Sequence, residues 1–157
     1  GDYEIRQNSL DLGITYIDRM TDPTTGRVGY MTTGSGSDAM TAAGLFCRLR
    51  FSQGPEDPRV SAGAEQLLRK LPGANWKNSA YGLFYASDAM SRLGGRWWTK
   101  WAPALKKHLL DAQLKEGDSA GAWPSAGDDW GKRADVGPIF VVSLYCISLV
   151  NFFEHRE

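Results

Sequence analysis

Two stretches of seven residues, 38 positions apart, decide the fold that this sequence predicts. Residues 41–47 read Thr-Ala-Ala-Gly-Leu-Phe-Cys, and residues 79–85 read Ser-Ala-Tyr-Gly-Leu-Phe-Tyr. A third stretch at residues 141–146, Val-Val-Ser-Leu-Tyr-Cys, matches the other two more loosely. A period of this length is typical of stacked helical repeats. Internal repetition is therefore the first prediction.

Six helices surround these stretches, separated by segments rich in turn residues. The expected helices span residues 3–20, 39–51, 59–71, 80–93, 97–115 and 136–153. The first, third and fifth carry a single apolar stripe at helical spacing, whereas the second, fourth and sixth are apolar on most sides, which is typical of buried helices. No alternating strand pattern competes with them. A single all-α domain over residues 1–157 is the prediction.

The alternation of the two helix types predicts three helical hairpins arranged in two layers. An inner helix contacts neighbours on several sides and must be apolar, whereas an outer helix keeps one face exposed to solvent. Small residues such as Ala42, Gly44 and Gly82 would let inner helices approach closely. The expected fold is an all-α, partial α/α toroid of three helical-hairpin repeats. A two-layer solenoid ranks second, because its repeats usually pair two amphipathic helices.

Residues near the end of the fifth expected helix resemble the motif of a known family. Gln113, Gly117 and the Gly-Ala-Trp of residues 121–123 resemble the Gln…Gly-x-Trp motif of squalene and oxidosqualene cyclases. The chain is thus similar to proteins with prenyltransferase and squalene oxidase repeats, in an uncharacterised bacterial branch of the terpene cyclase-like α/α toroids. The resemblance implies that Gln113 ties the outer helix to the following turn and that Trp123 stacks on the next repeat.

The catalytic groups that enzymes of this family use do not stand out. Residues 128–130, Asp-Asp-Trp, come nearest to the Asp-x-Asp-Asp motif of cyclases, but they lack the leading Asp and lie in a turn-like segment. His108 and His155 have no cysteine at zinc-like spacing and are expected to face solvent. Cys47 and Cys146 lie in apolar runs and are expected in the core, with a disulfide between them as the less favoured alternative. No catalytic residue, metal site or cofactor is therefore predicted.

Composition excludes two classes of partner. The 157 residues include 18 basic and 18 acidic side chains, and no basic cluster marks a nucleic-acid-binding face. No uninterrupted apolar run approaches the roughly 18 residues of a membrane-spanning helix. Residues 136–153 come closest, but Pro138 and Ser143 interrupt them. Nothing in the sequence indicates a cellular compartment.

Two hypotheses for function remain. The first is a non-catalytic helical repeat domain that mediates packing or protein interaction, because a half ring leaves its end hairpins exposed to the rest of a longer chain or to a second copy. The alternative is an apolar or isoprenoid ligand-binding domain, or a terpene cyclase- or prenyltransferase-like enzyme domain. Candidate binding residues at the rim of the inner helices are Tyr30, Asp38, Asn78, Tyr81, Tyr85, Arg133 and Asp135.

Overall fold

The computed structural model describes residues 7–51, 53–73, 79–124, 137–153 and 155. These residues form six α-helices: α1 (Gln7–Met20), α2 (Asp38–Arg50), α3 (Pro58–Leu68), α4 (Ala80–Leu93), α5 (Gly95–Ala112) and α6 (Gly137–Val150). A short 3-10 helix, η1 (Thr33–Ser35), precedes α2. Within the described ranges there are isolated β-bridges but no strands. The predicted all-α class with about six helices is confirmed.

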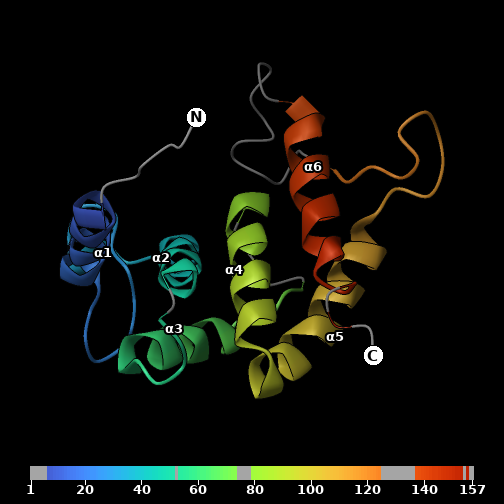
Figure 1. Ribbon diagram of the computed structural model, residues 1–157. Coiled ribbons are helices and arrows are strands. Elements are labelled where there is room, and N and C mark those ends of the chain that lie inside the picture. The colour runs from blue at the N-terminus through green and yellow to red at the C-terminus, as the bar shows by residue number, and fades with distance from the viewer. Residues whose placement is uncertain (1–6, 52, 74–78, 125–136, 154, 156–157) are drawn as a thin grey trace, which may run out of the picture.

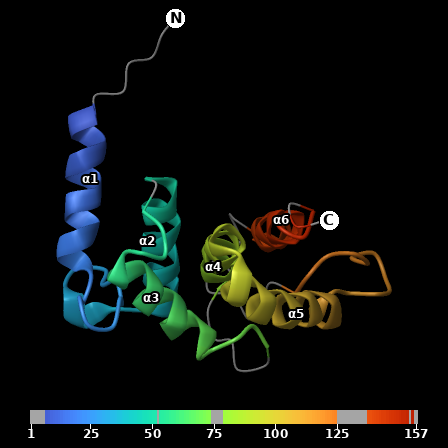
Figure 2. The same ribbon diagram turned by 60° about the horizontal axis from the view of Figure 1, so that its bottom comes forward.

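The described helices are arranged in two layers, with the three apolar helices in one of them. Helices α2, α4 and α6 lie side by side in one row, and α3 and α5 cross beneath it (Figures 1 and 2). Helix α4 packs against both α2 and α6, while α3 packs on α2 and α5 packs on α4. Helix α1 stands beside α2, at the end of the row opposite α6. Closure of such layers into a ring stays a prediction.

Short-range hydrogen bonds set the starts of three helices. The hydroxyl of Ser37 accepts from the backbone N–H of Met40 at 3.1 Å and caps α2, and Ser79 caps α4 in the same way. Asp57 caps α3, with Pro58 in the first turn, where its missing N–H costs nothing. The sequence offers Ser37 or Asp38 as the cap of the second helix and Asn78 or Ser79 as the cap of the fourth, and the structure shows the serine in both cases. Asp135, which the sequence favours as the cap of the sixth helix, lies outside the described residues.

Several predicted helix ends are wrong by two or three residues. Helix α3 stops at Leu68 rather than at residue 71, because Leu71 precedes Pro72, and a residue before proline disfavours helical geometry. Helix α5 spans Gly95–Ala112 instead of 97–115, since Gln113 takes up an extended backbone conformation. Helix α6 ends at Val150, and a turn occupies residues 151–153.

The main hydrophobic core lies between the two layers. The stripe predicted for the fifth helix is buried at Trp98, Trp101, Leu105 and Leu109, whereas its last member, Ala112, is half-buried. These side chains pack against residues of α2, α3 and α4 that are also buried, among them Leu45, Leu67 and Leu83. The predicted stripe of α1 (Leu10, Ile14, Ile17 and Met20) is only half-buried, and α1 has no fully buried residue. Helix α1 is therefore less buried than the other helices.

Gly44 of α2 has a different role from the one that the sequence indicated. A Cβ atom at this position would lie 2.7 Å from Cγ2 of Val28, in the loop between α1 and α2. The absence of a side chain at Gly44 therefore leaves room for this loop and for its buried residue Val28. It does not serve the approach of a neighbouring helix. The close approach of inner helices depends instead on residues such as Ala42 and Ala86, which are fully buried.

We expect Gly44→Ala to destabilise the protein by about 1 to 3 kcal/mol, as overpacking of a filled site does. The added methyl group would displace Val28, although alanine is the better helix former. Gly13→Ala in α1 is the matched control, because nothing lies within 4 Å of a Cβ there. Urea unfolding of the two variants measures the difference. Equal or greater stability of Gly44→Ala would contradict this account of the loop.

Candidate functional site

The predicted rim residues that the structure describes lie in the loop before α2, at the start of α2 and in the first two turns of α4. Tyr30 is exposed in the loop before α2, and Asp38 opens α2 with its carboxylate 2.9 Å from Nζ of Lys70. Tyr81 and Tyr85 lie on α4, with their rings edge to face and their centroids 4.7 Å apart. The other three candidates, Asn78, Arg133 and Asp135, lie outside the described residues.

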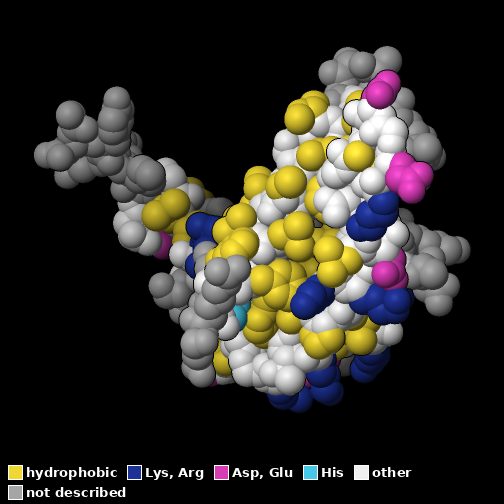
Figure 3. Space-filling model, turned by 90° about the vertical axis from the view of Figure 1, so that its right-hand side faces the viewer, with side chains coloured by type: hydrophobic (Ala, Val, Ile, Leu, Met, Phe, Trp, Pro, Cys, Tyr) yellow, Lys and Arg dark blue, Asp and Glu magenta, His cyan; other side chains and the backbone are white. Residues whose placement is uncertain are grey.

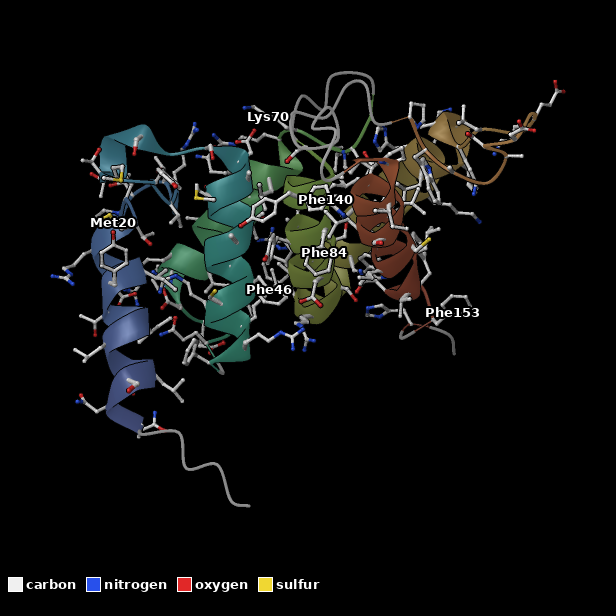
Figure 4. All side chains as sticks on the ribbon, turned by 90° about the horizontal axis from the view of Figure 1, so that it is seen from above. Met20, Phe46, Lys70, Phe84, Phe140 and Phe153 are labelled. Carbon is white, nitrogen blue, oxygen red and sulfur yellow. The ribbon has the colours of Figure 1, made fainter. Side chains whose placement is uncertain are left out.

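Four aromatic rings form a cluster on the inner helices, which we call the inner aromatic cluster: Phe46, Tyr81, Phe84 and Tyr85. The ring of Phe46 on α2 lies 5.0 Å from Tyr85 and 6.2 Å from Phe84, centroid to centroid. Figure 4 shows Phe46 and Phe84 on the neighbouring helices α2 and α4. Burial, followed by the adjacent Tyr85, raises the pKa of the Tyr81 hydroxyl. All four side chains are half-buried, so the cluster is a partly open surface.

Clefts lined by described residues lie away from this cluster. One, of about 580 Å³, lies between Pro23 and the turn at residues 53–59. Another, of about 710 Å³, lies between residues 71–73 and the last turns of α5 at residues 104–112. Neither cleft includes a predicted rim residue. Binding of an apolar ligand at the rim stays a prediction, because neither of these two clefts lies there.

His108 lines the larger cleft and is half-buried, so the expectation that it faces solvent is wrong. Its ring meets Tyr145 of α6 edge to face, at 6.3 Å between centroids. Burial lowers the pKa of the imidazole, although the nearby Asp111 opposes this shift. His155 is exposed as expected, but it also stacks on Trp98 at 5.0 Å.

The lowered pKa of His108 predicts a loss of stability in mild acid. The unfolded chain takes up a proton at an ordinary pKa of 6.5, whereas the folded protein resists it. The contribution of His108 is therefore present above pH 6.5 and is lost as the pH falls below that value. We expect His108→Gln to flatten this decline, measured by urea unfolding between pH 8 and pH 5. Parallel pH profiles for the variant and the wild type would contradict the prediction.

The end of α5 is tied to the following turn by the residues of the proposed family motif. Nε2 of Gln113 donates to the carbonyl of Gly121 at 2.9 Å. Nε1 of Trp123 donates to the carbonyl of Leu109 at 2.8 Å, and the buried indole meets the ring of Tyr145 edge to face. Trp123 therefore packs on α6 of the same hairpin rather than on a further repeat.

A charged network that the sequence did not predict holds α1 to α2 and α3. Oδ1 of Asp18 lies 2.6 Å from Nη1 of Arg48 and 2.7 Å from Nη1 of Arg59. Arg48 is only 1% exposed and also donates to Thr21 Oγ1 and Gln53 Oε1. The hydrogen bond from Arg59 lowers the pKa of Asp57. Because these opposite charges pair with one another, the network is structural rather than a reactive centre.

One signal for this network was present in the sequence. Arg48 interrupts an otherwise apolar stretch of α2, and a buried guanidinium needs an acidic partner. The partner, Asp18, lies 30 positions earlier on another helix, and helical periodicity does not identify such a pair.

Helix α6 carries two apolar stripes on opposite sides. The covered stripe is Val141, Tyr145, Ser148 and Phe152, which faces the core. The uncovered stripe is Ile139, Ser143, Cys146 and Val150, with Ile147 at its flank, and every one of these residues is exposed. Each position of the uncovered stripe precedes one of the covered stripe by two residues, which is about 200° around a helix.

The uncovered stripe overturns one sequence expectation. Cys146 was expected in the core, yet it is exposed on this stripe, while Cys47 is half-buried with its thiol pKa raised by burial. Both cysteines are free, so the alternative of a disulfide between them is not observed. Helix α6 is apolar on most sides, but among the described helices only α4 packs extensively against it.

The end of the molecule that carries α5 and α6 presents a broad apolar surface. Hydrophobic side chains form a patch across the middle of this view, and charged side chains gather along its border (Figure 3). An apolar centre with a polar rim is the usual anatomy of a protein interface. Among the described helices, none has the length and apolar character needed to cross a membrane.

Comparison of the chain with protein families, curated proteins and solved structures finds no match. The fold therefore defines the class by itself: an all-α protein whose described helices form two layers. The resemblance to squalene cyclase repeats stays a prediction, because one hydrogen bond from Gln113 does not identify a family. No group of three or more metal-binding side chains occurs among the residues that the structure describes.

Proposed function

We propose that this chain is a non-catalytic helical repeat domain that packs against other protein through the uncovered stripe of α6. The observation that supports the proposal is the contrast between α4 and α6. Helix α4 has neighbours on two sides and buries eight of its residues, whereas α6 is more apolar but fully buries only Val141 and Ser148. Helix α6 therefore has the composition of an inner helix, but among the described residues no second helix stands beside it in the row.

The exposed apolar side chains of this stripe would stabilise a complex if a partner buried them. Ile139 is 70% exposed, and Ile147 and Val150 are about half exposed. Covering each of them would contribute about 1 kcal/mol, since full burial of such a side chain contributes about 1.5 to 3 kcal/mol. Association also costs several kcal/mol of lost freedom. A contact limited to these side chains is therefore expected to be weak, with a dissociation constant nearer to millimolar than to micromolar.

Self-association is the most accessible test, because a second copy presents the same face. We expect the wild-type protein to sediment increasingly as a dimer as its concentration rises toward the millimolar range. Ile139→Glu is expected to abolish this shift, since it places a charge in the stripe. The side chain is largely exposed in the first turn of α6, where an acidic residue also favours the helix dipole, so the fold is expected to persist.

Leu12→Glu is the matched control for this experiment. Leu12 is 61% exposed on α1, at the opposite end of the row, and its substitution is expected to leave association unchanged. Circular dichroism verifies that both variants keep their helical content. If Ile139→Glu sediments as the wild type does at every concentration, the proposed role of the α6 stripe is wrong.

A further inference from the structure

The cleft of about 710 Å³ beside the end of α5 is built around His108. On α5 the lining residues Ala104, His108 and Ala112 follow one another at intervals of four, so they form one line along the helix. The two small alanines leave space on either side of the imidazole ring. The opposite wall is the segment of residues 71–73, where Leu71 is 41% exposed. A cleft of this volume is typical of small-molecule sites.

His108 brings an unused polar group into this cleft. Its ring packs on Tyr145 of α6, and among the described residues no hydrogen bond engages either ring nitrogen. Burial lowers the pKa of the imidazole, so the neutral ring prevails at neutral pH. A neutral imidazole carries one donor nitrogen and one acceptor nitrogen. A ligand that forms a hydrogen bond with the ring would therefore satisfy a group that is already half removed from water.

The lining determines which ligand chemistry fits the cleft. A hydroxyl group both donates and accepts, so it pairs with whichever ring nitrogen faces the cleft. Leu71 and Pro72 offer apolar contact to a flat ring on one wall, and the alanines of α5 do so on the other. At the rim, Nζ of Lys107 lies 2.6 Å from Oδ2 of Asp111, so a charged ligand of either sign would meet a like charge. These features together favour a neutral aromatic alcohol.

We propose that this cleft is a binding site for a small neutral aromatic alcohol, whose ring packs against Leu71 and Pro72 and whose hydroxyl group forms a hydrogen bond with His108. None of the lining residues belongs to the predicted rim or to the uncovered stripe of α6. The inference is therefore independent of the proposed function. The affinity is expected to be modest, because the ligand is small and the residues at the rim are exposed to solvent.

Titration of the whole protein with p-cresol, followed through backbone amide chemical shifts in nuclear magnetic resonance spectra, tests the site. Toluene is the matched probe, since it has nearly the same shape and lacks the hydroxyl group. We expect saturable shifts at Leu71, Gly73 and residues 104–112, with p-cresol binding several-fold more tightly than toluene. The absence of saturable shifts up to the solubility limit of toluene, or saturable shifts confined to other residues, would overturn the proposal.

Two histidine variants test the hydrogen bond. His108→Phe keeps an aromatic ring against Tyr145 but removes both nitrogens, and it is expected to abolish the preference for p-cresol over toluene. His155→Phe is the matched control, because the chain has only these two histidines and His155 stacks on Trp98 instead. The control is expected to keep the preference, and circular dichroism verifies that both variants keep their helical content. Equal affinity of the wild type for the two probes, or a preference that survives in His108→Phe, would overturn the role of His108.

Discussion

Asp18→Asn is expected to lower the free energy of unfolding by about 2 to 3 kcal/mol, less than the usual cost of breaking a fully buried ion pair, because the Asp18 side chain is 34% exposed and solvent screens it in part. The Asp18 carboxylate lies against both Arg48 and Arg59, and Arg48 is almost completely inaccessible to water. The amide has nearly the same shape but carries no charge. Arg48 would then keep its positive charge in the interior without the anion that compensates it.

Chemical unfolding followed by circular dichroism measures this effect, and two further variants interpret it. Asp111→Asn removes a carboxylate from an exposed pair with Lys107 and is expected to cost less than about 1 kcal/mol. Combining Asp18→Asn with Arg48→Met is expected to recover part of the loss, since an apolar side chain of similar length needs no counter-ion. A loss for Asp18→Asn as small as that for Asp111→Asn would show that the network contributes little.

Trp101→Ala is the second substitution with a large expected effect, about 3 to 5 kcal/mol. Trp101 is among the largest fully buried side chains of the described residues and lies in the core between the two layers. Its indole N–H donates to the hydroxyl of Ser87 on α4 at 3.1 Å. Truncation would leave a cavity and also remove the partner of a buried hydroxyl, and both effects destabilise the folded state.

The neighbouring residue supplies the matched control. Trp97 lies on the same helix and is only half-buried, with the guanidinium of Arg96 over its ring. Trp97→Ala is expected to cost clearly less than Trp101→Ala, because the surrounding side chains and solvent can fill more of the space. The difference should appear as a melting temperature several degrees lower for Trp101→Ala, at about 2 to 4 °C per kcal/mol. Equal melting temperatures would contradict the assigned core.

Much of the fold could be predicted from local patterns. The apolar stripe of α5, the serine caps of α2 and α4, and the order of six helices all depend on residues within a few positions of one another. The layer order follows from the contrast between amphipathic and apolar helices. Helix ends were less predictable, because Gln113 leaves the helix to bind Gly121, a contact beyond the reach of helical periodicity.

The candidate site could be predicted only in part, for a physical reason. Periodicity shows that a helix face is apolar, but it does not show whether a neighbour covers that face. For this reason Cys146 was expected in the core, although α6 stands at the end of the row. The contact between Tyr81 and Tyr85 follows from their helical spacing, whereas the link between Asp38 and Lys70 joins separate elements and was missed.

The central claim is that the uncovered stripe of α6 packs against other protein, and self-association tests it because a second copy presents the same face. Amide hydrogen exchange at low and high protein concentration tests it most directly, because the method reports on each segment of the chain. We expect protection of residues 139–150 to rise with concentration, while residues 7–20 of α1 exchange at the same rate throughout. Exchange in α6 that does not depend on concentration, in a protein that associates, would place the interface elsewhere and contradict the claim.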